Sequence, residues 1–302
     1  MKSISDDRRK FIKQTALLSA SGLIIPQSHI PAQPVSNKSN RNLKLSLNAY
    51  SFDQPLRSGH MDLMQLLDYC SRHGFDAIDP TGYYFPGYPV PPSDEYLYEF
   101  KRKAFRLGLD ISGTGIRNDF TQPDFVQRNA HLLLLAEWVE VASKMGAPLL
   151  RVFAGHYMPG THSREEITTW LIASLRQAAE IGRSKGIMIA LQNHDDFLRT
   201  DDEVIEVLEA VGSDWIGLHL DIGSLVSADP YREIERLIPY AINWQIKEFV
   251  RPLGQAQPTD YRKLLQLIYN SEYRGYLPLE TLGEGAPERV PGMLAAVREA
   301  MP

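Results

Sequence analysis

Short apolar runs alternate with longer amphipathic segments along the chain from residue 43 to the C-terminus. Several of the apolar runs end abruptly in polar residues, as in IALQNHDDF at 189–197, which is typical of a buried strand that delivers side chains to a site. In the segments between them, apolar residues recur at helical spacing, as at Leu63, Leu66, Leu67 and Cys70. The pattern therefore predicts strands and helices in regular alternation.

Eight strand and helix pairs can be placed in this way. The segment 81–94 is rich in Pro, Gly and Tyr and interrupts the rhythm, so we expect a long loop there that forms a lid or a pocket wall. We expect strands at residues 43–52, 75–80, 109–116, 148–155, 187–196, 215–224, 242–250 and 276–283. We expect helices at residues 61–74, 95–108, 129–146, 164–186, 200–212, 229–240, 260–275 and 289–301.

This alternation indicates parallel strands joined by right-handed helical crossovers. Eight such units in about 260 residues are typical of an α/β fold, the (β/α)8 TIM barrel, as a single domain over residues 43–302. An open doubly wound sheet is the alternative. No G-x-G-x-x-G motif stands between a strand and its helix and no P-loop is present, so we do not expect a dinucleotide site.

The N-terminal region has the features of an export signal. A twin arginine, Arg8 and Arg9, precedes a mildly apolar run at 15–25 that is too short and too weakly apolar to span a bilayer. Residues 1–26 therefore resemble a twin-arginine (Tat) signal peptide, residues 27–42 form a flexible linker, and we expect the folded protein in the periplasm. The alternative is a charged amphipathic helix that belongs to the folded domain.

Composition and charge narrow the choice of partners. The chain has 302 residues, is 43% hydrophobic and carries a net charge of −5, which removal of the signal's five basic and two acidic residues would change to −8. No basic block stands in the body of the chain, so we expect a small-molecule partner and no nucleic acid. We expect no stable membrane span in the mature form, and a homo-oligomer stays open. The single cysteine, Cys70, excludes an internal disulfide and has the pattern of a core residue.

Polar residues gather at the ends of the last four predicted strands. In a TIM barrel the carboxyl ends of the strands form the mouth that holds the active site. Side chains two residues apart on a strand point the same way, so each strand is expected to direct polar pairs into the barrel. The pairs are Gln192 with His194, His219 with Asp221, and Gln245 with Lys247, and Glu280 ends the last strand.

These residue types suit a divalent cation. Asp221, Glu280, two amide oxygens and a histidine make an oxygen-rich set for Mn²⁺, Mg²⁺ or a similar ion. A polar layer with a purely structural role is the alternative, because a Gln or Asp at a strand end often caps the next helix or holds a loop. The residues expected to bind a substrate at the same mouth are Asn48, Tyr50, Arg117, Arg151, His156 and His219.

The succession ALQNH, GLHLDIGS, NWQIKE and LPLETLG resembles the xylose isomerase-like barrel family, often called sugar phosphate isomerases/epimerases and related to AP endonuclease family 2. The likeness covers residues 43–302. It implies one divalent metal ion held by Glu, Asp, His and Glu, and by motif these positions are Gln192, Asp221, Gln245 and Glu280. Two of the four differ, and Ser224 stands where the family often has a His, so we expect a weakly held, exchangeable metal.

The resemblance also implies proton removal next to the carbonyl group of a sugar, with the metal binding the substrate oxygens. Because the Gln192 amide cannot act as a base, we expect His194 and Glu280 to transfer the proton and Lys247 to polarise an oxygen. The predicted activity is that of a sugar isomerase or epimerase. A lyase or dehydratase acting on a 3-keto-glycoside or an inosose-like substrate is one alternative, and a non-catalytic sugar-binding barrel is another.

The predicted export favours an unphosphorylated sugar or keto-sugar, because sugar phosphates are mainly cytoplasmic. We do not expect an endonuclease-like phosphoesterase, since the additional histidines of its metal cluster are missing. The aromatic residues at 83–88 are expected either to stack on a sugar ring or to pack within their own loop. For Arg151, a buried salt bridge to Asp79 is as well supported as contact with the substrate.

Overall fold

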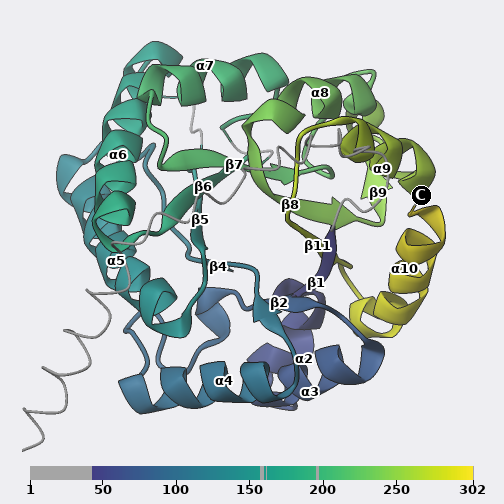
Figure 1. Cartoon of the computed structure of the whole chain (residues 1–302). Helices are drawn as coiled ribbons and strands as arrows, with labels where there is room; N and C mark the ends of the chain where they lie inside the picture. The colour runs from purple at the N-terminus through teal and green to yellow at the C-terminus, as the bar shows by residue number, and fades with distance from the viewer. Residues whose placement is uncertain (1–42, 157–159, 161, 195–196, 302) are drawn as a thin grey trace, which may run out of the picture. The chain divides into compact units, whose positions relative to one another are not determined.

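Nine strands form one parallel sheet that nearly closes into a barrel (Figure 1). The computed structural model describes residues 43–156, 160, 162–194 and 197–301, and its sheet order is β3-β2-β1-β11-β8-β7-β6-β5-β4. The predicted TIM barrel in a single domain is confirmed. Its strands are β1 Lys44–Asn48, β2 Ala77–Asp79, β3 Asp110–Ile111, β4 Thr114–Gly115, β5 Leu149–Phe153, β6 Met188–Gln192, β7 Ile216–Asp221, β8 Ala241–Lys247 and β11 Tyr276–Glu280.

The third predicted strand is divided into β3 and β4. Because β3 pairs with β2 whereas β4 pairs with β5, the two halves belong to opposite edges of the sheet. Gly113 lies between them, where a Cβ atom would come within 2.6 Å of Leu149 Cδ1, so a larger residue would require the Leu149 side chain to shift. A single parallel bridge between Thr81 and Gly115 connects the two edges. The chain therefore crosses from one edge to the other at the seam where the barrel closes.

Helices connect successive strands on the outside of the barrel, as predicted (Figure 1). Three of them begin with a capping box, in which Asp62, Ser163 or Thr200 accepts a hydrogen bond from the backbone N–H three residues later and a Gln or Glu side chain bonds back. The helices are α3 Leu63–His73, α4 Asp94–Arg106, α5 Phe125–Met145, α6 Arg164–Lys185, α7 Asp201–Val211, α8 Pro230–Leu237, α9 Tyr261–Asn270 and α10 Ala286–Ala300.

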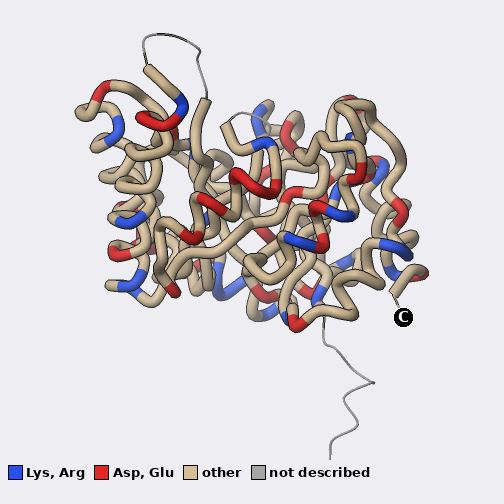
Figure 2. The backbone as a smooth tube through the Cα atoms, turned by 90° about the horizontal axis from the view of Figure 1, so that it is seen from above, with Lys and Arg blue, Asp and Glu red and all other residues tan. Residues whose placement is uncertain are grey.

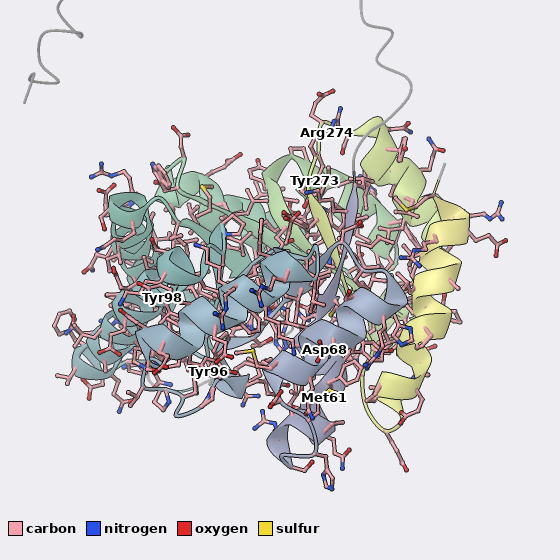
Figure 3. The ribbon with its side chains drawn as sticks, turned by 60° about the horizontal axis from the view of Figure 1, so that its bottom comes forward. Met61, Asp68, Tyr96, Tyr98, Tyr273 and Arg274 are labelled. Carbon is pink, nitrogen blue, oxygen red and sulfur yellow. The ribbon has the colours of Figure 1, made fainter. Side chains whose placement is uncertain are left out.

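The outer surface carries charged residues of both signs. Figure 2 shows Lys and Arg interspersed with Asp and Glu along the backbone. Some of them join neighbouring helices: Asp68 on α3, labelled in Figure 3, lies 2.8 Å from the Lys103 Nζ of α4. Within the described part of the chain, no helix is both long enough and apolar enough to cross a membrane.

Side chains along the strands alternate between the helix-facing layer and the barrel interior. On β8, Trp244 and Ile246 are buried apolar residues, whereas Gln245 and Lys247 line a cavity at the mouth. This is the two-residue period expected from the sequence. The alternation explains how a strand that is buried on both sides still carries polar groups to a site.

The first strand is shorter than predicted. It ends at Asn48, whose side-chain Oδ1 accepts a hydrogen bond of 2.9 Å from the Tyr50 N–H. This cap begins a 3-10 helix, η1 Ala49–Phe52, which leads into α2 Asp53–Arg57. The expectation that Tyr50 lies on the strand is therefore wrong, because the Asn48 side chain turns the chain into a helix.

The seventh predicted strand also ends early. After β8, Phe249–Val250 (β9) pairs antiparallel with Gln257–Pro258 (β10) as a separate two-stranded sheet. The loop at 81–94 contains a short 3-10 helix, η2 Gly82–Tyr84. The predicted signal peptide 1–26 and linker 27–42 lie outside the described residues.

Candidate active site

A cavity of about 390 Å³ lies at the carboxyl ends of the barrel strands. The structure brings together there all of the predicted site residues except His219 and Asp221. Those that line it are Asn48, Tyr50, Arg117, Arg151, His156, Gln192, His194, Gln245, Lys247 and Glu280.

The Lys247 ammonium lies between two carboxylates at the base of this cavity. Its Nζ is 3.0 Å from Asp221 Oδ2 and 3.0 Å from Glu280 Oε2. The sheet order accounts for this arrangement, because β8 lies between β7, which ends in Asp221, and β11, which ends in Glu280. Gly223 makes room for the lysine chain, since a Cβ atom there would be 2.6 Å from Lys247 Cδ.

Lys247 and Asp221 hold each other in their charged forms. Burial lowers the pKa of the Lys247 ammonium, but the nearby Asp221 and Glu280 carboxylates raise it by more, so its pKa lies above the ordinary lysine value. Burial raises the pKa of Asp221, but Lys247, His194 and hydrogen bonds lower it by more, so its pKa lies below the ordinary range. The base of the cavity is therefore a fixed ion cluster.

Hydrogen bonds fix the Asp221 carboxylate further. Gln192 Nε2 donates to its Oδ2 at 2.8 Å, and the Gly223 N–H donates to its Oδ1 at 2.9 Å. The neighbouring Asn193 side chain exchanges two hydrogen bonds with the Asp221 backbone and so ties the end of β6 to the end of β7. Asp221 is fully buried and does not line the cavity.

His219 lies below the cavity and not in its wall. Its side chain is fully buried, and its Nε2 is 2.9 Å from Gln245 Oε1. Burial, followed by the positive charge of Arg151, lowers the pKa of His219 to about 3, so the ring is neutral and its Nε2–H donates to the amide oxygen. The expectation that His219 binds the substrate is therefore wrong, because Gln245 covers it.

The donor set at the four metal positions does not fit a divalent ion. The Lys247 ammonium lies between the two acids, Asp221 and Glu280, that were expected to bind the metal. Gln192 presents an amide N–H to Asp221, and Gln245 uses its oxygen on His219. Throughout the described residues, no three or more His, Cys, Asp or Glu side chains are grouped as metal ligands. We therefore derive no step of the chemistry through a metal.

Aromatic rings and guanidinium groups form the upper wall. Arg117 lies over the Tyr83 ring at 4.7 Å, and Arg151 lies over the Phe153 ring at 4.3 Å. The His194 ring meets the edge of Phe153 at 5.3 Å. His194 follows β6 instead of lying on it as expected, but it still reaches the cavity.

Of the aromatic cluster at 83–88, only Tyr83 lines the cavity. Tyr84 donates to Asp53 at 2.5 Å, Phe85 belongs to the core, and Tyr88 accepts a hydrogen bond of 2.9 Å from the Arg117 N–H. The cluster thus divides its roles, with one ring facing the site and three supporting the loop.

Arg151 contacts the cavity and forms no salt bridge with Asp79. Asp79 lies near enough to feel the guanidinium, but no ion pair joins the two. Burial raises the pKa of Asp79 to about 6, although Arg151 partly offsets this.

Six wall residues are not among the site residues predicted from the sequence: Phe153, Gly155, Gly223, Phe249, Arg251 and Leu282. Phe153 is the last residue of β5, Phe249 lies in β9 and Arg251 follows β9 directly, so these three share the position at strand ends that identifies the other site residues.

Comparison with known proteins identifies the family. A family model described as xylose isomerase-like TIM barrel matches residues 67–300. The chain belongs to this family. No curated protein sequence matches it.

Several solved structures share the fold of this chain at low sequence identity. D-psicose 3-epimerase from Clostridium cellulolyticum H10, solved with D-tagatose, has a TM-score of 0.71 and 14% identity over 86% of this chain and 99% of its own. The 3-keto-D-glucoside 4-epimerase YcjR from E. coli has a TM-score of 0.69 and 14% identity over 85% and 99%. The probable 3-DHS dehydratase AsbF from Bacillus anthracis has a TM-score of 0.67 and 17% identity over 85% and 99%.

Metal ions occur in some of these similar structures. The IOLI protein, with a TM-score of 0.70, was solved with a bound zinc atom, and a xylose isomerase-like barrel protein from Mycobacterium smegmatis, with a TM-score of 0.66, was solved with magnesium. Because their sequences are only 16% and 20% identical to this chain, they establish the fold and not its ligands.

Proposed function

We propose that this protein is an exported enzyme that moves a proton at the carbon next to the carbonyl group of an unphosphorylated sugar or keto-sugar. One observation carries the proposal: Glu280, a carboxylate that lines the cavity, is 3.0 Å from a buried ammonium group, Lys247 Nζ. A base beside a fixed positive charge is what proton removal next to a carbonyl requires, because negative charge develops on the carbonyl oxygen as the proton leaves.

In the proposed reaction, the Glu280 carboxylate accepts the proton from the substrate carbon. The Lys247 ammonium stabilises the negative charge that develops on the substrate oxygen, which is the task that a divalent ion would otherwise supply. Asp221 takes no proton, because its two oxygens already accept hydrogen bonds and its role is to hold Lys247.

His194 is the second proton-transfer group. It follows β6 and lies three strands away from β11, which carries Glu280, so the two groups approach the substrate from different sides of the cavity. Return of a proton from His194 to the opposite face of the same carbon gives an epimer, and return to the neighbouring carbonyl carbon gives an isomer.

A dehydratase is the second candidate. The observation that favours it is the pairing of one carboxylate with one imidazole, because His194 can protonate a departing hydroxyl group while Glu280 removes the proton. Epimerases and a dehydratase both occur among the similar structures, which supports either reaction on this barrel.

Deuterium exchange tests the proposal. The mature domain is incubated in D₂O with ordinary sugars and with their 3-keto derivatives, and incorporation next to the carbonyl is followed by NMR. We expect exchange with a keto-sugar, a loss of roughly a hundredfold or more in Glu280→Gln, and no loss in the exposed control Glu288→Gln.

The result separates the candidates. Deuterium exchange that gives a sugar of unchanged composition supports an epimerase or isomerase. A product that has lost water supports the dehydratase. Binding of sugars without any exchange would contradict the proposal and support a non-catalytic sugar-binding barrel.

A further inference from the structure

Positively charged side chains predominate among the charged residues that line the cavity, although the whole chain carries a net charge of −5. Four cationic side chains line it, Arg117, Arg151, Lys247 and Arg251, whereas Glu280 is the acidic one among the described lining residues. Asp221 and Asp79 lie buried below, so the positive groups still outnumber the acidic ones. A pocket of this kind attracts an anionic ligand.

The arginines of the cavity have no carboxylate partner within the described ranges, in contrast to others on the surface. Arg57 and Arg289, for example, each form an ion pair with an acidic side chain. Arg151 is only 5% exposed, and its buried Nη1 makes no hydrogen bond with a described residue. Burying such a donor unpaired is costly, which indicates that a ligand completes its bonding.

The Arg151 guanidinium is held in a fixed orientation. It lies over the Phe153 ring on one side and against Gly115 on the other, where a Cβ atom would be only 2.6 Å from its Nε and Nη2. Gly115 is also its register partner on the neighbouring strand, and Arg117 follows two residues later over the Tyr83 ring. The guanidinium groups of Arg151 on β5 and of Arg117, two residues after β4, therefore flank one part of the cavity.

We infer that the substrate is an acidic sugar, and that Arg151 and Arg117 bind its carboxylate beside Tyr83. This inference rests on the proposed function for the sugar part of the ligand. A planar carboxylate with two oxygens matches a guanidinium fork. The carboxylate would also orient the substrate relative to Glu280 and His194.

The surrounding groups favour a carboxylate over a phosphoryl group. Asn118 is already engaged in two hydrogen bonds with the Phe153 backbone. The helices that follow β4 and β5 have N-termini capped by Asp124 and by the Ser163 capping box, so their backbone N–H groups do not offer a phosphate site. Two guanidinium groups suffice for two oxygens, but a phosphoryl group presents three.

Calorimetric titration tests this with named probes. D-Glucuronate and D-galacturonate are compared with their neutral parents, D-glucose and D-galactose, and with D-glucose 6-phosphate. We expect each acid to bind at least tenfold more tightly than its parent, and the preference to fall by roughly tenfold or more in Arg151→Gln and in Arg117→Gln. Arg151→Lys should recover only part of the preference, because a lysine keeps the charge without the planar fork.

Control variants distinguish a specific loss of acid binding from a loss of folding. Arg102→Gln removes an exposed arginine of α4 and should leave the preference unchanged. Arg117 is itself exposed, so its variant should fold even if the buried Arg151→Gln does not, as checked by circular dichroism. The inference is overturned if neither acid binds more tightly than its parent, or if D-glucose 6-phosphate binds more tightly than both acids.

Failure of this inference can be told from failure of the proposed function. A preference for the acids without deuterium exchange would leave acid recognition standing and remove the catalytic proposal. Deuterium exchange with neutral keto-sugars, together with no preference for acidic sugars, would support the catalytic proposal and contradict the acid recognition.

Discussion

Lys247→Met provides a quantitative test of the ion cluster at the base of the cavity. The substitution keeps most of the side-chain volume but leaves Asp221, which is fully buried, and Glu280, 2% exposed, without their shared cation. Removing one partner of a buried ion pair costs about 3–5 kcal/mol of unfolding free energy. The hydrogen bonds to Asp221 from Gln192 and Gly223 remain, so we expect the unfolding free energy to fall by an amount near the lower end of this range.

The loss should depend on pH. In the wild type the pKa of Asp221 is lowered, so its contribution to stability is present above its unfolded pKa and is lost as the pH falls below about 4. Without Lys247, burial is the dominant effect and raises the pKa of Asp221. Ionisation of the buried Asp221 then lowers the unfolding free energy of the variant as the pH rises. The difference between wild type and variant should therefore be larger at pH 7 than at pH 5.

Urea unfolding at pH 5 and pH 7 measures the difference. Lys44→Met serves as the matched control, because Lys44 pairs with Asp110 at 2.5 Å while both side chains are 47% exposed, and such a pair contributes about 1 kcal/mol or less. Equal losses in the two variants, or a Lys247→Met loss that is the same at both pH values, would refute the reasoning.

The same variant tests the misfit to a metal. Once the ammonium is gone, Asp221 and Glu280 face each other without a cation, and we expect Mn²⁺ to raise the unfolding temperature of Lys247→Met but not that of the wild type. A wild-type protein that is purified with one metal ion per chain and is stabilised by it would contradict the misfit.

Three further substitutions test individual contacts. Asp79→Asn should stabilise the protein more at pH 8 than at pH 5 in urea unfolding, because the pKa of Asp79 is raised to about 6 and its ionisation penalises the fold as the pH rises through that value; a stabilisation that is equal at the two pH values would contradict this. The pKa of His219 is lowered to about 3, so between pH 6.5 and pH 4 the unfolded chain binds a proton at this residue before the folded protein does, and the wild type loses unfolding free energy. In His219→Gln this decrease of the unfolding free energy should be smaller. An equal decrease in wild type and variant would show that the ring is not buried in its neutral form. Gly115→Ala should reduce the titrated affinity for D-glucuronate without changing any charge, because the new Cβ atom displaces the Arg151 guanidinium; unchanged affinity would mean that its orientation does not matter.

The barrel was predictable because periodicity is a local property of the chain. The strands at 187–196 and 215–224 were recognised from their apolar runs, and their polar ends were placed at the mouth by the general rule for TIM barrels. The early end of the first strand does not follow from the apolar pattern, because it depends on one side-chain cap, in which the Asn48 Oδ1 accepts a hydrogen bond from the Tyr50 N–H.

The chemistry of the site was only partly predictable. The two-residue period correctly directed Gln192, Gln245 and Lys247 inward, but it could not say how deep each side chain would end. His219 lies one layer too low to reach a ligand, and Lys247 is long enough to occupy the space between two acids on neighbouring strands. Such depth and reach depend on the stacking of side chains inside the barrel, which no single strand encodes.

The position of the Lys247 ammonium has a consequence for the supply of cations. A positive charge that is covalently part of the chain cannot dissociate, cannot be exchanged for a competing ion and cannot be stripped by a chelator. We therefore expect the protein to keep its working site in surroundings where free metal ions are scarce or variable. Its full positive charge is present as soon as the chain has folded.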